Sequence, residues 1–127
     1  MVVQNWDSKS YQRDTGFVSV YGEDVLGWLE PKPDERILDL GCGPGLHARA
    51  MIGKGHTVDA IDATQAFVNA AISQGVAARL ATFDDITSHN AYDGSWASFS
   101  LLHAPRADVA HHVEALAHAL KPGGAFF

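Results

Sequence analysis

Short apolar runs alternate along the chain with segments in which apolar residues recur every three or four positions. The apolar runs predict buried strands at 36–40, 57–61, 78–83, 95–101 and 125–127. The periodic segments predict helices at 10–30, 46–53, 65–73 and 106–120. Strands that alternate with helices form a parallel sheet with helices on both faces. We therefore predict a doubly wound, mostly parallel α/β fold with strand order 3-2-1-4-5.

Two prolines, Pro31 and Pro33, separate the first predicted helix from the remainder of the chain. Proline disfavours helix both at its own position and at the residue before it. A chain of 127 residues is long enough for one domain with a buried core. We expect a single domain over 1–127, with an N-terminal helical cap segment at 1–33 and an α/β core at 34–127.

The candidate chemistry lies where the first strand of the core ends. Residues 39–45 read Asp-Leu-Gly-Cys-Gly-Pro-Gly, so that Gly41, Gly43 and Gly45 stand at alternate positions. Glycine lets the backbone turn sharply and lets a ligand approach where a Cβ would clash. The second strand runs into Asp62, which is placed to accept hydrogen bonds from both hydroxyls of a ribose. Together these features predict a nucleoside-binding crevice.

The spacing of the glycines favours a nucleoside without a pyrophosphate. The dinucleotide fingerprint is Gly-x-Gly-x-x-Gly, and Leu46 stands where its third glycine would be. Asp39, inside the first strand, would repel a pyrophosphate and suits a cationic ligand. An NAD-dependent oxidoreductase shares the crevice and the ribose acid, and it is therefore the less favoured alternative.

The run from Asp39 to Gly45, with Asp62 about one βαβ unit later, resembles motif I of the class I S-adenosylmethionine-dependent methyltransferases. These have a Rossmann-like core, and their cofactor carries a cationic sulfonium and ammonium but no phosphate. The resemblance implies S-adenosyl-L-methionine as the cofactor and methyl transfer to a small-molecule acceptor as the function. It does not name the acceptor, which leaves O-, N- and C-methylation open.

The resemblance extends over nearly the whole chain. Tyr11 and residues 17–24 look like the N-terminal segment of methyltransferases related to the trans-aconitate enzymes, in which such a tyrosine helps to close the site. An amphipathic packing helix is the alternative for this segment. The sequence departs from the family at 14–16, where a histidine and a serine are common, and this departure puts the substrate in doubt.

The resemblance also implies roles for single residues. It assigns the ribose hydroxyls to Asp62 and the adenine amine to Asp84, beside Phe83, with Thr82 and Asp85 as alternatives to Asp84. His103, after the fourth strand, is the candidate catalytic residue, either binding an acceptor carboxylate or acting as a base. A histidine bonded to its own loop is the alternative. The implied cofactor-binding set is Tyr11, Asp39, Gly41, Cys42, Gly43, Gly45, Asp62, Ala63, Phe83, Asp84, Ser100 and Leu101.

The amino-acid composition and charge limit the kinds of partner that the chain can bind. Apolar residues make up 46% and charged residues 19%, and a formal charge of −6 without any basic run argues against a nucleic-acid partner. No apolar stretch approaches the roughly 20 residues that cross a bilayer, and the start lacks a signal-peptide pattern. The single cysteine, Cys42, excludes an internal disulfide and fits a reducing compartment. We expect a cytoplasmic protein with no membrane partner.

The last predicted helix carries three of the seven histidines, His111, His112 and His118. No pair of them has the spacing of a helical zinc site, so we expect no metal and interpret all three as surface or rim residues. The buried face of this helix is predicted to consist of Val109, Val113, Leu116 and Leu120.

The sequence ends on Phe126 and Phe127, inside the predicted fifth strand. Methyltransferases of the resembled class continue past such a Lys-Pro-Gly-Gly turn with a helix and two more strands. We therefore expect a C-terminally truncated domain that lacks these strands. An apolar edge strand normally has a neighbour. Two alternative hypotheses follow: an inactive S-adenosylmethionine-binding module, or a subunit completed by a partner or by a second copy at the strand-5 edge.

Overall fold

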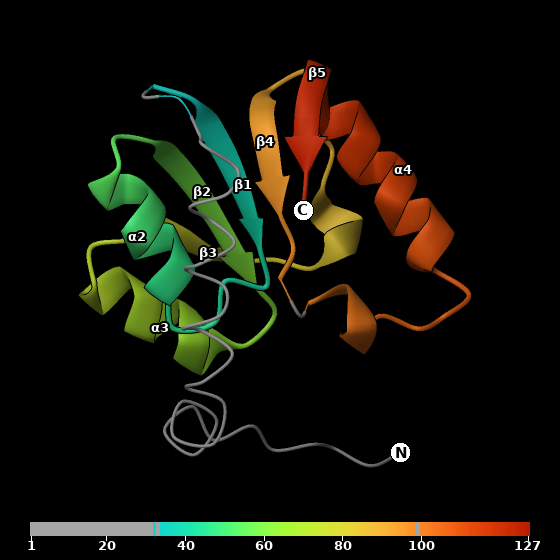
Figure 1. Cartoon of the computed structure of the whole chain (residues 1–127). Coiled ribbons are helices and arrows are strands. Elements are labelled where there is room, and N and C mark those ends of the chain that lie inside the picture. Colours follow the sequence, from blue (N-terminus) through green and yellow to red (C-terminus); the bar gives the residue numbers. More distant parts are fainter. Residues whose placement is uncertain (1–31, 33, 99) are drawn as a thin grey trace.

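The computed structural model describes residues 32, 34–98 and 100–127 of the chain. The expected cap helix and Tyr11 lie outside the described residues. The described part forms a five-stranded sheet in the order β3-β2-β1-β4-β5, in which every neighbouring pair of strands is parallel (Figure 1). This order confirms the predicted doubly wound α/β fold.

Strands and helices alternate along the described chain as the pattern predicts. The strands are β1 (Arg36–Leu40), β2 (Thr57–Asp62), β3 (Ala78–Leu80), β4 (Tyr92–Trp96) and β5 (Leu120–Phe126). The helices are α2 (Leu46–Gly53), α3 (Gln65–Ser73) and α4 (Val109–Ala119), with short 3-10 turns η1 (Phe83–Asp85) and η2 (Leu101–His103). Within these described residues, no helix has the length and apolar character that crossing a membrane requires.

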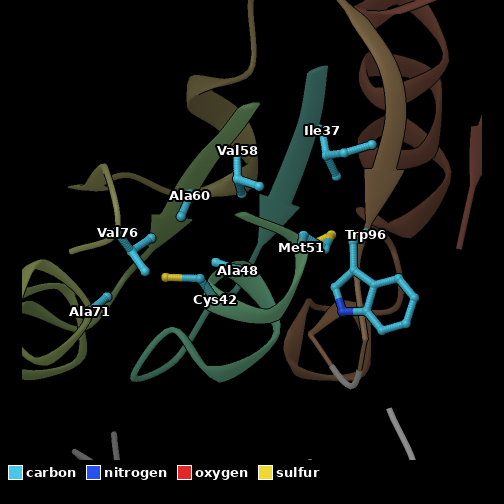
Figure 2. Packing of buried hydrophobic residues seen from close by; sticks show 9 residues of the cluster. All are labelled: Ile37, Cys42, Ala48, Met51, Val58, Ala60, Ala71, Val76 and Trp96. Carbon is cyan, nitrogen blue, oxygen red and sulfur yellow. The ribbon is translucent and has the colours of Figure 1, made fainter. Parts of the chain in front are cut away.

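Strand β1 shows how the sheet divides the core into two layers. Ile37 belongs to a buried cluster with Met51 of α2 and Ala71 of α3, which Figure 2 shows from close by. Leu38 and Leu40 belong to a second cluster with Leu116 of α4. Successive strand residues point to opposite faces, so α2 and α3 cover one face and α4 covers the other (Figure 1). Burial of each leucine contributes about 1.5–3 kcal/mol.

Two strands differ from their predicted ranges. The third strand was expected over 78–83, but β3 ends at Leu80 and the chain turns into η1. Thr82 and Asp85 form a reciprocal capping box there, which draws these residues out of the sheet. The fourth strand was expected over 95–101, but β4 begins at Tyr92 and ends at Trp96. Its start is extended because Tyr92 pairs with Leu120 of β5, and the Tyr92 hydroxyl also donates to the Asp59 carboxylate of β2 at 2.8 Å.

The last helix and strand also differ from the prediction. Helix α4 begins at Val109 rather than at 106, because the N–H of Asp108 closes a turn onto the carbonyl of Pro105. Strand β5 begins at Leu120 rather than at 125, and the predicted turn at 121–124 lies inside it. These residues form an irregularity in the pairing with β4, which Gly123 accommodates with a φ of +79°.

The buried face of α4 is rotated from the predicted one. Val113 is 40% exposed, whereas His112 beside it is only 4% exposed. Leu116 and Ala119 lie on the same inner face as His112 and are almost fully buried. The interpretation of His112 as a surface or rim residue is therefore wrong, and a polar ring lies between α4 and η1.

Candidate cofactor-binding site

Backbone hydrogen bonds hold the glycine loop after β1. The N–H groups of Gly41 and Cys42 both donate to the carbonyl of Ile61 in β2, at 2.8 and 2.9 Å. Gly41 has a φ of +68°, and a Cβ on it would lie 2.5 Å from the Cβ of Ser100. Only glycine allows this loop and the segment after β4 to approach so closely. The contact between the two segments shapes one end of the site.

A cavity of about 570 Å³ opens where β1, β2 and β4 end. This volume lies within the range of small-molecule sites. Nine residues predicted from the sequence line it: Gly41, Cys42, Gly43, Asp62, Ala63, Phe83, Asp84, Ser100 and His103. The cavity therefore brings together the glycine loop, the acid after β2, the acid in η1 and the histidine in η2.

Three predicted cofactor-binding residues lie outside the cavity lining. Gly45 begins α2 with a φ of +89°, and a Cβ there would lie 3.1 Å from the side chains of Ala71 and Val76. A glycine here therefore allows the end of the loop to pack closely against Ala71 and Val76. Leu101 packs against the core cluster beneath α4. Asp39 is buried in β1 and is 2% exposed. Neither Gly45 nor Leu101 lines the cavity, and their assignment to the cofactor stays a prediction.

Asp62 joins the two loops that form the floor of the cavity. Its Oδ2 accepts a hydrogen bond from the N–H of Gly43 at 2.9 Å, and its Oδ1 accepts one from the N–H of Thr64 at 2.8 Å. The residue is 9% exposed. Each carboxylate oxygen has a further lone pair. Asp62 can therefore hold both loops and still accept hydrogen bonds from two hydroxyls of a ligand.

Asp39 lies in β1, just before the glycine loop, with an unsatisfied oxygen. Its Oδ2 is buried and has no hydrogen-bond partner among the described residues. Burial raises the pKa of Asp39 to about 7, and the charge of Asp62 adds to this shift. Burial raises the pKa of the Cys42 thiol as well, followed by the charges of Asp39 and Asp62. Cys42 is therefore protonated at neutral pH, which is unsuited to a nucleophile.

The turn η1 carries the residues predicted to meet an adenine. Phe83, Asp84 and Thr82 line the cavity, whereas Asp85 is absent from the lining and forms the capping box with Thr82. His112 reaches this turn from α4: its Nε2 lies 3.1 Å from Oδ1 of Asp84. The ring centroids of His112 and Phe83 are 5.1 Å apart. Of the three candidate residues, Thr82 and Asp84 are thus the two in contact with the cavity.

The sequence interpretation missed several cavity residues: His47, Thr64, Phe67, Ser98, Asp108 and His112. His47 is the clearest example. The indole N–H of Trp96 donates to its Nδ1 at 3.1 Å, which leaves the proton of the neutral imidazole on Nε2. The signal available in the sequence was a histidine directly after the glycine loop, where the first turn of a helix faces the ligand.

The polar groups of the cavity fit a cationic nucleoside better than a dinucleotide. The carboxylates of Asp62, Asp84 and Asp108 line the cavity. No lysine or arginine among the described residues lines it. The buried hydroxyl oxygen of Ser100 in the lining, and a buried carboxylate oxygen of Asp39 outside it, lack partners within the described part of the chain. Hydroxyls, an amine and a positive charge would match these acceptors, whereas a pyrophosphate would not. The residues present therefore fit S-adenosylmethionine. Over the residues that the structure covers, no group of three or more potential ligands could hold a metal ion.

Known proteins share both the sequence pattern and the fold. The family described as "Methyltransferase domain" matches residues 37–124. A ubiquinone biosynthesis O-methyltransferase from Xylella fastidiosa (strain 9a5c) is 30% identical over 130 residues, which cover 96% of this chain and 52% of that protein. The chain thus spans about half the length of the curated relatives it matches.

Solved structures of methyltransferases share the fold of this chain. A chain of the complex between the Haloferax volcanii Trm112 methyltransferase activator and a methyltransferase aligns with a TM-score of 0.79 and 25% identity, covering 94% of this chain and 54% of that one. An S-adenosylmethionine-dependent methyltransferase from Mesorhizobium loti aligns with a TM-score of 0.73 and 27% identity, covering 81% and 50%. The matched family, these relatives and the glycine loop decide against an NAD-dependent oxidoreductase. The chain belongs to the class I S-adenosylmethionine-dependent methyltransferases.

Proposed function

We propose that this chain binds S-adenosylmethionine in the cavity at the ends of β1, β2 and β4 and transfers its methyl group to a small-molecule acceptor. The observation that carries the proposal is the buried carboxylate of Asp62, which holds the glycine loop at Gly43 while lining the cavity. The family membership of the chain and the names of its relatives support the same conclusion.

Each end of the cofactor has matching groups in this proposal. Asp62 accepts hydrogen bonds from the ribose hydroxyls, and Asp84 accepts one from the exocyclic amine of the adenine, whose ring lies against Phe83. The buried carboxylate of Asp39 stabilises the positive charge of the methionine end from beneath the glycine loop. Ser100, whose buried hydroxyl has no partner in the described chain, is available to the same end.

When bound, S-adenosylmethionine supplies an electrophilic methyl group on a sulfonium. The residues of this chain hold the acceptor in line with that group and exclude water, and such alignment can supply most of the acceleration. A carboxylate acceptor needs no base, whereas a phenol gains from one. His103, which lines the cavity from η2, is the candidate for binding an acceptor carboxylate or accepting a phenolic proton. Relatives named O-methyltransferases make oxygen acceptors the first class to test.

Calorimetric titration tests the cofactor. We expect micromolar binding of S-adenosylmethionine and S-adenosylhomocysteine and no binding of NAD. A chain that circular dichroism shows to be folded but that binds neither sulfur nucleoside would overturn the proposal. Formation of S-adenosylhomocysteine is then followed with phenols, carboxylic acids and amines. His103→Gln should lower turnover of a phenol with little change in cofactor affinity.

A second candidate is a cofactor-binding module that needs another subunit for activity. Phe126, the last residue of the edge strand β5, is 45% exposed, and Phe127 directly after it is 43% exposed. One structural neighbour comes from a complex with an activator protein, and the chain spans about half the length of its relatives. Cofactor binding without turnover would favour this candidate. Light scattering would show whether a second copy pairs at this edge, since the dimer should then weaken on Phe126→Lys.

A further inference from the structure

We infer that His112 is a positioning residue of the adenine subsite, whose imidazole holds Asp84 in the orientation that accepts the exocyclic amine of the cofactor. The inference rests on the proposed function, because it needs an adenine in this cavity. It adds a residue from α4 to a site whose other predicted residues come from the loops after the strands and from two short 3-10 turns.

The burial of His112 requires a partner. Its side chain is 5% exposed, and a buried polar group costs free energy unless it is hydrogen-bonded. Nδ1 has no partner among the described residues, whereas Nε2 lies 3.1 Å from Oδ1 of Asp84. An ionised carboxylate can only accept, so Nε2 carries the proton in this contact. The hydrogen bond to Asp84 is thus what compensates the burial of the ring.

Asp84, in contrast to His112, is exposed. Its side chain is 74% exposed on a turn of three residues, so without a partner it would sample several rotamers. Ordering such a side chain when the ligand arrives would cost conformational entropy. The contact with His112 restricts the carboxylate before binding, which is a form of preorganisation. It engages Oδ1 and leaves Oδ2 to accept from an amine.

The same imidazole also contacts the neighbouring ring of the subsite. The centroids of His112 and Phe83 are 5.1 Å apart, with an angle of 38° between the rings. Phe83, Asp84 and His112 all line the cavity. His112 therefore touches both the residue assigned to the face of the adenine and the residue assigned to its amine.

A cofactor analogue separates positioning from simple packing. S-adenosylhomocysteine and its deaminated analogue, in which a hydrogen replaces the exocyclic amine, are titrated into the full chain. The wild type should prefer S-adenosylhomocysteine by about tenfold. His112→Leu should weaken S-adenosylhomocysteine by about five- to tenfold and leave the analogue within about twofold. His112→Gln, whose amide can still donate, should restore most of the preference. His118→Gln, on the exposed face of α4, is the matched control and should change nothing.

Other results of these titrations would overturn either the inference or the proposed function. Equal weakening of both ligands by His112→Leu would show a structural role only, and a wild type that binds both ligands equally would remove Asp84 as the amine acceptor. Either result overturns the inference but leaves the proposed function standing. A folded wild type that binds neither ligand contradicts the proposed function itself. If His112→Leu does not fold, NMR of the wild type with isotope-labelled histidine still decides, because a proton on Nδ1 rather than on Nε2 would overturn the inference.

Discussion

The backbone N–H of Gly43 lies 2.9 Å from Oδ2 of Asp62, so the glycine loop after β1 is bound to the last residue of β2. The other oxygen of the same carboxylate accepts from the N–H of Thr64. One side chain therefore holds two loops that lie far apart in the sequence. Its removal should change both the shape of the site and the contacts that the site offers.

Asp62→Ala should weaken S-adenosylhomocysteine by about 10- to 100-fold, because hydrogen bonds to a carboxylate contribute about 1.5–3 kcal/mol. It should also lower the melting temperature, since two N–H groups lose their acceptor. Calorimetry and thermal unfolding measure the two effects. Glu114→Gln, which removes a negative charge from the exposed side of α4, is the control. Unchanged affinity in Asp62→Ala would exclude it as the ribose ligand.

Asp39→Asn should change how stability depends on pH. The fold raises the pKa of Asp39 from 3.8 to about 7, chiefly by burial, so the folded chain keeps a proton that the unfolded chain has lost. The contribution of Asp39 to the free energy of unfolding therefore falls as the pH rises from about 4 to about 7. Above pH 7 this contribution is constant. Urea unfolding across this range should show a flatter profile for Asp39→Asn. Parallel profiles for the two proteins would contradict the prediction.

Asp39 should also make the affinity for S-adenosylmethionine depend on pH. A cationic sulfonium favours the ionised carboxylate, so binding should tighten as the pH rises through about 7. S-adenosylhomocysteine carries no sulfonium and should show a weaker dependence. Titrations of both ligands at pH values on either side of 7 measure this difference, and Asp39→Asn should abolish it. The same pH dependence for both ligands would show that the ionisation of Asp39 is not coupled to the charge of the sulfonium.

Gly41→Ala and Gly43→Ala form a matched pair. Both glycines have positive φ, at +68° and +54°, so each alanine should cost about 1–2 kcal/mol through backbone strain. A Cβ on Gly41 would also meet the Cβ of Ser100 at 2.5 Å, whereas a Cβ on Gly43 meets nothing within 4 Å. Gly41→Ala should therefore be the more destabilising by about 1–3 kcal/mol. Chemical unfolding of the two variants tests this order, and equal losses would contradict it.

Phe127→Ala should destabilise the chain more than Phe126→Ala. The ring of Phe127 stacks on Trp96 with centroids 4.3 Å apart, and such a pair contributes about 0.5–1.5 kcal/mol beyond burial. Phe126 has similar exposure but no ring contact within the described chain. Urea unfolding measures both losses. A larger loss for Phe126→Ala would show that the stack contributes little.

Local signals were enough to predict some elements and not others. Helices α2 and α3 have the predicted bounds, because the signals that end them lie beside them in the sequence. Strand β4 was misplaced because its start depends on pairing with a distant part of the chain, Leu120 of β5. Helix α4 was placed nearly correctly, but its buried face was not. Apolar periodicity favoured Val113, whereas the contact of His112 with Asp84 compensates the burial of a polar ring.

The candidate site likewise contains residues that could be predicted from the sequence and residues that could not. The glycine spacing and Asp62 could be read from the sequence because the backbone conformation of a loop demands particular residues at particular positions. His112 could not, since it acquires its place through Asp84, a partner on another element. Gly45 was assigned to the ligand because its spacing matched, although its positive φ and its close approach to Ala71 and Val76 already favour a glycine there.

The cavity is lined by residues from Gly41 to His112, and β1, at the centre of the sheet, is the first described strand to be synthesised. On the ribosome, β1 to β3 can pair as soon as they emerge, whereas β4 must still reach the other side of β1. The glycine loop is then present before α4 closes the opposite wall. Full cofactor affinity should therefore arise only late in synthesis, because a nascent chain that ends before α4 would hold Asp62 but not His112, and both residues line the cavity.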